Sequence, residues 1–166
     1  MRLFIGVPLP TNLKEKILDI TKKLNVEGVK LIPKENLHIT LSFLGEVDDV
    51  GRIKSRLRDL PSSIFKIRRA GVFPSIDYIR VVWLGVDGGM NIVEELKKRG
   101  FDVNDVLHVT IARVKRKPNK KHIKDFIKSV GYVGEFKGNA CLFKSVLMKP
   151  SPKYINLFCP GLTKGF

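Results

Sequence analysis

The sequence contains little cysteine, histidine or tryptophan. Its 166 residues include two cysteines, three histidines and one tryptophan. Cys141 and Cys159 lie far apart in apolar, strand-like segments, without the close spacing of a zinc or redox motif. We therefore expect both cysteines to be small buried hydrophobic residues rather than reactive groups.

Long hydrophobic runs are also missing. No segment approaches the roughly 18 consecutive apolar residues that a membrane-spanning helix needs, and residues 3–7 (LFIGV) are typical of a strand rather than of a secretory signal. With 43% hydrophobic residues, the chain is long enough for one compact core and too short for two. We expect a single domain over residues 1–166, located in the cytoplasm and without a membrane partner.

Acidic residues are scarce relative to basic ones. The chain has 16 Asp and Glu against 31 Lys and Arg, which gives a formal net charge of +15. Basic clusters occur at residues 68–69, 97–99, 115–117 and 120–121. They indicate an anionic partner, and nucleic acid is the commonest polyanion that such patches meet in a cell. A lysine-rich surface that serves solubility or thermal stability is the alternative.

A five-residue pattern occurs twice. Residues 37–41 (LHITL) and 107–111 (LHVTI) share the order apolar, His, apolar, Thr, apolar, and they contain two of the three histidines. In a β-strand successive side chains point to opposite faces, so His38 and Thr40 share one face, as do His108 and Thr110. Each strand therefore presents an imidazole beside a hydroxyl, while its apolar residues hold it against a core.

Helical and strand patterns surround the two copies in a similar order. Strands are expected at residues 3–7, 29–32, 37–44, 64–72, 78–86, 106–114, 132–136, 141–148 and 154–159, and helices near residues 11–24, 49–60, 89–99 and 119–130. In each half a helix precedes the His-containing strand, and another helix and strand follow it. We expect an α+β fold of two pseudo-symmetric lobes, each an antiparallel sheet with helices on its outer face, around a central cleft that brings the His-Thr pairs together.

Two imidazoles and two hydroxyls at one site are suited to displacement at phosphorus. Because imidazole has an unperturbed pKa near 6.5, one histidine can act as general acid while the other acts as general base. The hydroxyls of Thr40 and Thr110 can donate to phosphoryl oxygens. Neither copy has a neighbouring His, Cys or carboxylate at ligand spacing, so we expect no metal. Purely structural roles in half-buried strands are the alternative for all four residues.

Around these residues the sequence resembles the 2H phosphoesterases, a family named for two facing His-x-Thr/Ser-x motifs in a bilobal α/β structure. The resemblance to its branch called RNA 2′,3′-cyclic phosphodiesterase, or 2′-5′ RNA ligase, rests on residues 1–5, 36–41, 43–47, 73–75, 83–86, 108–115 and 145–154. It implies hydrolysis of a terminal RNA 2′,3′-cyclic phosphate to a 2′-phosphate, with reverse 2′-5′ ligation as a secondary activity. It also implies that His38 is the proton donor to the leaving 3′-oxygen and that His108 is the base that activates water. The residues alone leave open which histidine plays which role.

Four further residues are candidates near the site. Arg113 fits the family pattern, but strict alternation places it on the face opposite the phosphate-binding side chains, and only a bulge or a strand end brings it to the phosphate. Phe43, Trp83 and Tyr154 are candidates for stacking on an RNA base. Core packing is the favoured interpretation for Phe43 and Trp83, because aromatic residues in β segments usually face a core.

The resemblance implies RNA with 2′,3′-cyclic phosphate ends as the partner, tRNA fragments among them, and a monomer that needs no cofactor. Two alternatives stay open, namely a non-catalytic RNA-end-binding protein and a 2H enzyme for a small nucleotide cyclic phosphate. The large positive charge favours RNA over a small nucleotide.

Overall fold

The computed structural model describes residues 1–160 of the chain. Its strands are β1 (Arg2–Pro8), β2 (Val29–Leu31), β3 (His38–Glu46), β4 (Ser63–Pro74), β5 (Ile79–Gly88), β6 (His108–Val114), β7 (Tyr132–Gly138), β8 (Cys141–Val146) and β9 (Lys153–Phe158). Its α-helices are α1 (Thr11–Thr21), α2 (Val50–Arg56), α3 (Met90–Lys98) and α4 (Lys120–Ser129), with short 3-10 helices η1 (Lys22–Leu24) and η2 (Lys34–Asn36).

Two of the helices begin at side-chain caps. The backbone amide of Arg52 donates to Oδ1 of Asp49 at the start of α2, and the amide of His122 donates to Oδ1 of Asn119 at the start of α4, both at 3.1 Å. Each cap satisfies an amide that has no partner within its own helix. The element order and the approximate bounds agree with those expected from the hydrophobic patterns.

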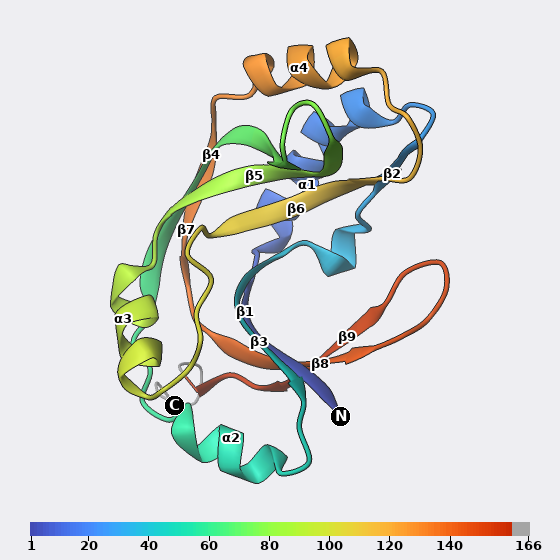
Figure 1. The fold of residues 1–166 in the computed structure, drawn as a ribbon. Coiled ribbons are helices and arrows are strands. Elements are labelled where there is room, and N and C mark those ends of the chain that lie inside the picture. The colour runs from blue at the N-terminus through green and yellow to red at the C-terminus, as the bar shows by residue number, and fades with distance from the viewer. Residues whose placement is uncertain (161–166) are drawn as a thin grey trace.

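All nine strands of residues 1–160 belong to one curled antiparallel sheet (Figure 1). Its order is β7-β4-β5-β6-β3-β1-β8-β9. Outside this order, β2 pairs with the last three residues of β6. The two His-containing strands, β3 and β6, are the central neighbours, and each has three further strands on its outer side. They join at a short contact in which Ile39 lies opposite Val109. The expected α+β class and its two lobes are confirmed, with the lobes as the two halves of a continuous sheet.

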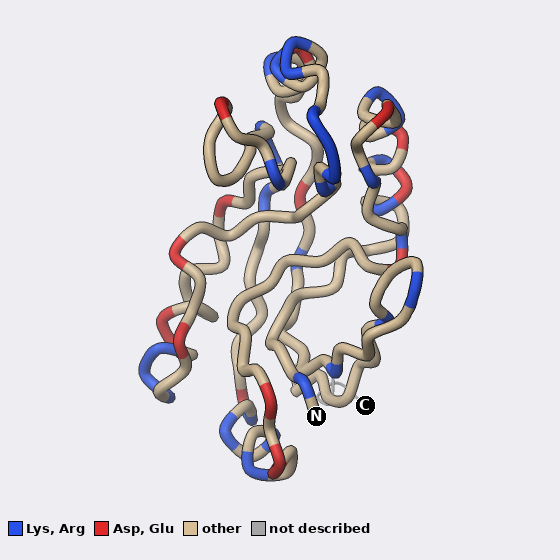
Figure 2. Tube along the Cα trace, turned by 45° about the vertical axis from the view of Figure 1, so that its right-hand side comes forward, with Lys and Arg blue, Asp and Glu red and all other residues tan. Residues whose placement is uncertain are grey.

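The helices lie around the periphery of this curled sheet, as Figures 1 and 2 show from two directions. α1 packs against β7, where Gly134 leaves room for the side chain of Leu13. α2 and α3 are held together by Arg99, whose Nη1 donates to the carbonyl of Arg56 at 3.1 Å. Within residues 1–160, no helix is both long enough and apolar enough to cross a membrane.

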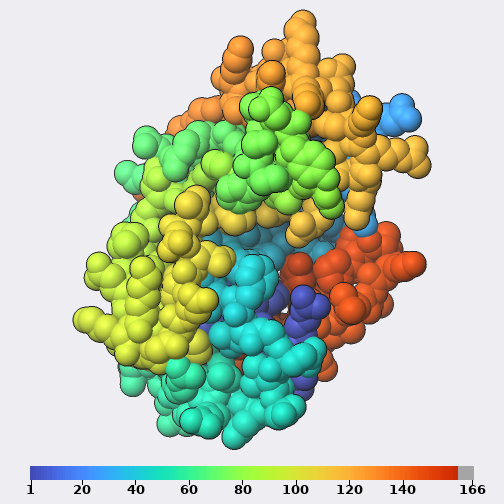
Figure 3. Space-filling view, viewed as in Figure 1, coloured from blue at the N-terminus to red at the C-terminus, as the bar shows by residue number. Residues whose placement is uncertain are grey.

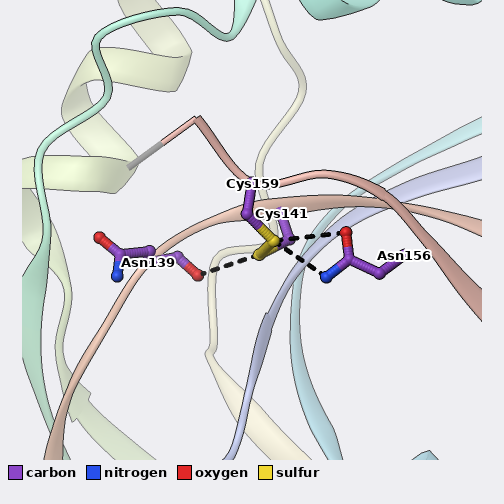
Figure 4. Close-up of a disulfide and its surroundings, with 4 residues drawn as sticks. All are labelled: Asn139, Cys141, Asn156 and Cys159. Atoms are coloured by element: carbon purple, nitrogen blue, oxygen red, sulfur yellow. Dashed lines mark hydrogen bonds between the residues drawn. A yellow bond between two sulfur atoms is a disulfide. The ribbon is translucent and has the colours of Figure 1, made fainter. Parts of the chain in front are cut away.

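The two cysteines form a disulfide, shown in Figure 4. Cys141 begins β8 and Cys159 follows β9, and their Cα atoms are 4.2 Å apart. Cys141 is buried, as expected, but Cys159 is only half-buried, and the two are covalently joined rather than being simple hydrophobic residues. The antiparallel β8–β9 hairpin returns the chain to its starting point, a proximity that their separation of 18 residues does not reveal. The disulfide therefore closes the base of this hairpin.

Candidate active site

One cavity lies where β3 and β6 meet, and it has a volume of about 340 Å³. His38, Thr40, His108 and Thr110 all line it. In the space-filling view of Figure 3, a hollow is visible between the yellow segment of β6, the cyan segment of β3, the blue N-terminal strand and the red β8–β9 hairpin. The structure thus brings together the four side chains that the repeated pattern singled out.

The pairing of β3 with β6 explains how the four side chains meet. Ile39 and Val109 lie opposite each other, and both are 0% exposed. Because the strands are antiparallel, the residue before one partner comes opposite the residue after the other. Each histidine therefore faces toward the threonine of the other strand, which gives the cavity an approximate twofold arrangement of imidazole and hydroxyl.

Both imidazole rings are held through Nδ1. In His38 this atom lies 2.7 Å from the carbonyl oxygen of Asn36, and in His108 it lies 3.0 Å from that of Val106. A carbonyl only accepts, so Nδ1 donates in both rings, and Nε2 remains for proton transfer. Nε2 of His38 lies 2.8 Å from the hydroxyl of Thr40 and accepts from it when the ring is neutral.

The pKa of His38 is lowered from its ordinary value. The main cause is the loss of water around the half-buried ring, and the positive charges of Lys14, His108 and Arg113 act in the same direction. The hydrogen bond to the Asn36 carbonyl opposes this shift. The lowered pKa favours the neutral form of the His38 ring at neutral pH.

Arg113 reaches the cavity because β6 contains a bulge. Thr110 pairs with Trp83 of β5 and Ala112 pairs with Val82, so Ile111 is an extra residue on β6. Ile111 and Ala112 consequently both point into the core, at 1% and 0% exposure, and the alternation resumes one residue later. Arg113 then lies on the same face as Thr110 and lines the cavity. The bulge that Arg113 needs to reach this face of the strand is therefore present.

An equivalent bulge occurs in β3, and it places the side chain of Phe43 on the cavity face instead of the core face. Thr40 pairs with Gly6 of β1 and Ser42 pairs with Ile5, so Leu41 is the extra residue. Leu41 and Ser42 are both 0% exposed, whereas Phe43 is 71% exposed and lines the cavity. Core packing was therefore the wrong expectation for Phe43. This residue occupies the place in its lobe that Arg113 occupies in the other.

Aromatic side chains flank both histidines. Phe4 and Tyr154 have ring centroids 5.0 and 5.1 Å from the ring of His38, and that of Phe73 is 5.0 Å from the ring of His108. These contacts restrict the orientation of both imidazoles. Burial raises the pKa of Tyr154, whereas the positive charge of Arg113 lowers it. Burial has the larger effect, so the hydroxyl stays protonated.

Trp83 packs against Phe73, the ring that flanks His108. It is half-buried, its ring centroid lies 5.2 Å from that of Phe73, and it covers Gly71 so closely that a Cβ there would come within 2.2 Å of the indole. This agrees with a packing role. Phe4 and Phe73 were not singled out beforehand, although both fall within stretches that carry the family resemblance.

Two asparagines of the cavity are hydrogen-bonded to the backbone around it. Asn104 and Asn36 line it, and their side-chain amides donate to the carbonyls of Thr40 at 3.0 Å and of Pro152 at 2.9 Å. Arg2 is a further basic residue among the lining side chains. Within residues 1–160, no three His, Cys, Asp or Glu side chains are grouped so that they could hold a metal ion.

Sequence comparison identifies relatives that cover most of the chain. A family model described as LigT-like phosphoesterase matches residues 7–83. The RNA 2′,3′-cyclic phosphodiesterase of Methanocaldococcus jannaschii is 41% identical, over 93% of this chain and 96% of the relative. The protein of the same name from Archaeoglobus fulgidus is 44% identical, over 70% of this chain and 74% of the relative.

Solved structures show the same fold. A crystal structure of a Thermus thermophilus protein superposes with a TM-score of 0.81 and 24% identity, over 97% of this chain and 98% of that one. The crystal structure of Escherichia coli LigT complexed with phosphate gives a TM-score of 0.70 and 23% identity, over 95% and 94% of the two chains. At these identities the likeness concerns the fold alone.

The family resemblance drawn from the sequence is confirmed by these relatives. It removes the alternative of a non-catalytic RNA-end-binding protein, because the M. jannaschii relative, named as a phosphodiesterase, is aligned over 93% of the chain. The chain is an enzyme of the phosphodiesterase class, and it belongs to the LigT-like phosphoesterases of the 2H family.

Proposed function

We propose that this enzyme hydrolyses the terminal 2′,3′-cyclic phosphate of RNA to a 2′-phosphomonoester, without a metal ion. The observation that carries the proposal is the pairing of two imidazoles across one cavity, each held through Nδ1 and each on a strand that also brings a threonine into the cavity. The names of the M. jannaschii and A. fulgidus relatives and the net charge of +15 support RNA as the substrate.

The reaction is an in-line displacement at phosphorus. Nε2 of His108 takes a proton from water as the water oxygen bonds to phosphorus, and the bond from phosphorus to the 3′-oxygen breaks. Nε2 of His38 gives its proton to that leaving oxygen. The product carries a 2′-phosphate and a free 3′-hydroxyl, and a proton has moved in effect from one imidazole to the other.

The negative charge of the phosphoryl oxygens is stabilised by donors that line the cavity. Thr40 and Thr110 donate their hydroxyls from opposite sides of the cavity, and Arg113 adds a guanidinium on the same face. All three side chains already line the cavity before the substrate arrives, and only the Thr40 hydroxyl has to turn from His38. Little reorganisation is therefore needed as charge builds up on the oxygens.

The acid role of His38 depends on the bound substrate. Its pKa is lowered in the free enzyme by burial and by neighbouring positive charges. A phosphodiester anion in the cavity offsets those positive charges and favours the protonated imidazole. The hydroxyl of Thr40 then turns from Nε2 of His38 toward a phosphoryl oxygen, which frees the ring to serve the leaving group.

Ligation uses the same groups in the same roles, with a 5′-hydroxyl in place of water. His108 takes a proton from that hydroxyl as its oxygen bonds to phosphorus, and His38 gives its proton to the leaving 3′-oxygen. A cyclic phosphate end and a 5′-hydroxyl end would then be joined through a 2′-5′ linkage. We propose ligation as the secondary activity, because water is far more abundant than any RNA end.

The test uses a short RNA with a 2′,3′-cyclic phosphate end, incubated in EDTA. His38→Ala and His108→Ala are each expected to lower turnover about 10²–10⁴-fold. His122→Ala is the matched control, because the third histidine lies on α4 and contacts the carbonyl of Lys23 outside the cavity. Full activity in either of the first two variants, or a need for added metal, would contradict the proposal.

A further inference from the structure

A second hollow lies beyond the end of β6 and has a volume of about 660 Å³. We call it the β6 groove. Its charged lining residues are five cations, Arg80, Lys115, Arg116, Lys117 and Lys120, and one carboxylate, Asp77. All six are exposed. In Figure 2 the segment that leads from β6 toward α4 is one of the longest unbroken stretches of basic residues.

The five cations of the β6 groove form no ion pair within residues 1–160. Other basic clusters do contain ion pairs. Arg68 and Arg69, for example, contact the carboxylate of Asp87 at 2.6 and 3.2 Å. Arg99 contacts Glu95 at 3.1 Å. The groove therefore keeps its attraction for an anionic ligand.

The groove continues the active-site cavity along a single strand. β6 carries His108, Thr110 and Arg113 into the cavity and then leads directly to Lys115. At about 3.3 Å per residue, the distance from Thr110 to Lys115 is roughly 17 Å, which a few nucleotides span. The amide of Lys115 donates to the carbonyl of Gly28 at 2.8 Å, so the start of the basic segment is fixed to the fold.

An exposed aromatic ring lies in the same groove. Tyr78 is 59% exposed, and its hydroxyl accepts a hydrogen bond from Nη1 of Arg80 at 2.9 Å. The guanidinium of Arg80 also lies 5.7 Å from the centroid of the tyrosine ring. A ring oriented in this way, beside several lysines, is the combination that single-stranded nucleic acid uses for stacking and for backbone contacts.

We infer that the β6 groove binds the sugar-phosphate backbone of the single-stranded RNA that precedes the cyclic phosphate end. This inference rests on the proposed function, since the chain must enter the cavity by its 3′ end. The strand leaves the cavity past Arg113, follows β6 and contacts residues 115–117 with successive phosphates. The enzyme thereby favours oligonucleotides over a mononucleotide that contains the same cyclic phosphate.

The experiment compares two triple variants with matched loss of charge. Lys115→Gln/Arg116→Gln/Lys117→Gln removes the basic segment of the groove. Arg58→Gln/Lys97→Gln/Lys98→Gln removes one arginine and two lysines that are exposed near α2 and on α3, outside both hollows. Each protein is assayed with a mononucleotide 2′,3′-cyclic phosphate and with oligonucleotides of increasing length that have the same terminal nucleotide. Binding of an oligonucleotide with a 2′-phosphate end is measured as a function of salt.

The unaltered enzyme is expected to show a kcat/KM that rises with oligonucleotide length. In the groove variant, kcat/KM for the oligonucleotides should fall about tenfold, while kcat/KM for the mononucleotide stays unchanged. Its slope of log affinity against log salt should fall by about 2, because each phosphate contact on a single strand contributes about 0.7. The control variant should retain both the length dependence and the slope.

Three outcomes would overturn the inference. They are an absence of length dependence in the unaltered enzyme, an equal loss in both triple variants, and an unchanged salt slope in the groove variant. Failure of the proposed function is distinct, because it removes hydrolysis of mononucleotide and oligonucleotide alike. The binding measurement still tests the groove in that case.

Discussion

Ile39 lies opposite Val109 at the one paired position that joins the two halves of the described sheet, and both side chains are fully buried. Each residue separates the histidine and the threonine of its own strand. The apolar contact therefore sets the distance between the two catalytic imidazoles that we propose. Packing in the core and chemistry in the cavity depend on the same few residues.

Ile39→Ala is expected to lower the free energy of unfolding by about 2–5 kcal/mol, because it leaves a cavity at the strand junction. Ile39→Val should cost only about 0.5–1.5 kcal/mol and keep the activity. Denaturant unfolding measures both, with Ile64→Ala on β4 as an exposed control at 49% exposure. A loss in Ile39→Ala no larger than in the control would show that the junction does not stabilise the fold.

Arg113→Gln is expected to lower kcat/KM about 10- to 100-fold for a mononucleotide cyclic phosphate as well as for RNA. A charge-assisted hydrogen bond to the phosphate is worth about 1.5–3 kcal/mol, and the side chain is exposed, so the fold should be unaffected. Arg52→Gln on α2 serves as the control. Unchanged activity in Arg113→Gln would mean that the guanidinium lines the cavity without contacting the phosphate.

Phe43→Ala is expected to weaken substrate binding, because we propose that its exposed ring stacks on the terminal base. Stacking on an aromatic side chain is worth about 1–3 kcal/mol per base, so KM should rise by about tenfold or more. Phe43→Tyr should restore binding. Tyr132→Ala, which removes an aromatic residue of 60% exposure from β7, is the control for general effects. An unaltered KM in Phe43→Ala would exclude the stacking role.

Lys14→Gln tests which histidine is the acid. Removing this positive charge raises the pKa of His38, because Lys14 is one of the groups that lower it. At pH values above both histidine pKa values, the rate is proportional to the protonated fraction of the acid. If His38 is the acid, kcat/KM should therefore increase by about twofold on the alkaline flank of the pH profile and stay unchanged on the acidic flank.

A change on the acidic flank instead would identify His38 as the base. If His38 is the base, the rate at low pH is proportional to its neutral fraction, so Lys14→Gln would lower kcat/KM on the acidic flank and leave the alkaline flank unchanged. Lys16→Gln, which changes an exposed lysine of the same helix, is the matched control. The apparent pKa values belong to the pair of histidines, but the two flanks still separate the roles.

The alternation of residues 37–41 and 107–111 was sufficient to predict which side chains share a face. It could not reveal the bulges at Leu41 and Ile111, because an extra residue in one strand is defined only by its pairing with another. Those bulges bring Phe43 and Arg113 to the cavity. Strict alternation therefore failed two residues after each threonine, at Ser42 and Ala112, just before the side chains that the bulges add to the cavity.

Contacts between distant strands also could not be predicted from the sequence. Phe4 and Tyr154 lie on β1 and β9, yet both rings pack around His38. Cys141 and Cys159 pair because β8 and β9 form a hairpin, not because of their spacing. In each case a local pattern indicated a strand, and the neighbour of that strand was decided by the long-range order of the sheet.

The product formed from one defined RNA end tests the central claim most directly. An oligonucleotide with a 2′,3′-cyclic phosphate is incubated with the enzyme in EDTA, and the 2′- and 3′-phosphate products are separated. Our account predicts the 2′-phosphate alone, because the acid serves the 3′-oxygen. A 3′-phosphate product, or no opening of the cyclic phosphate, would contradict it.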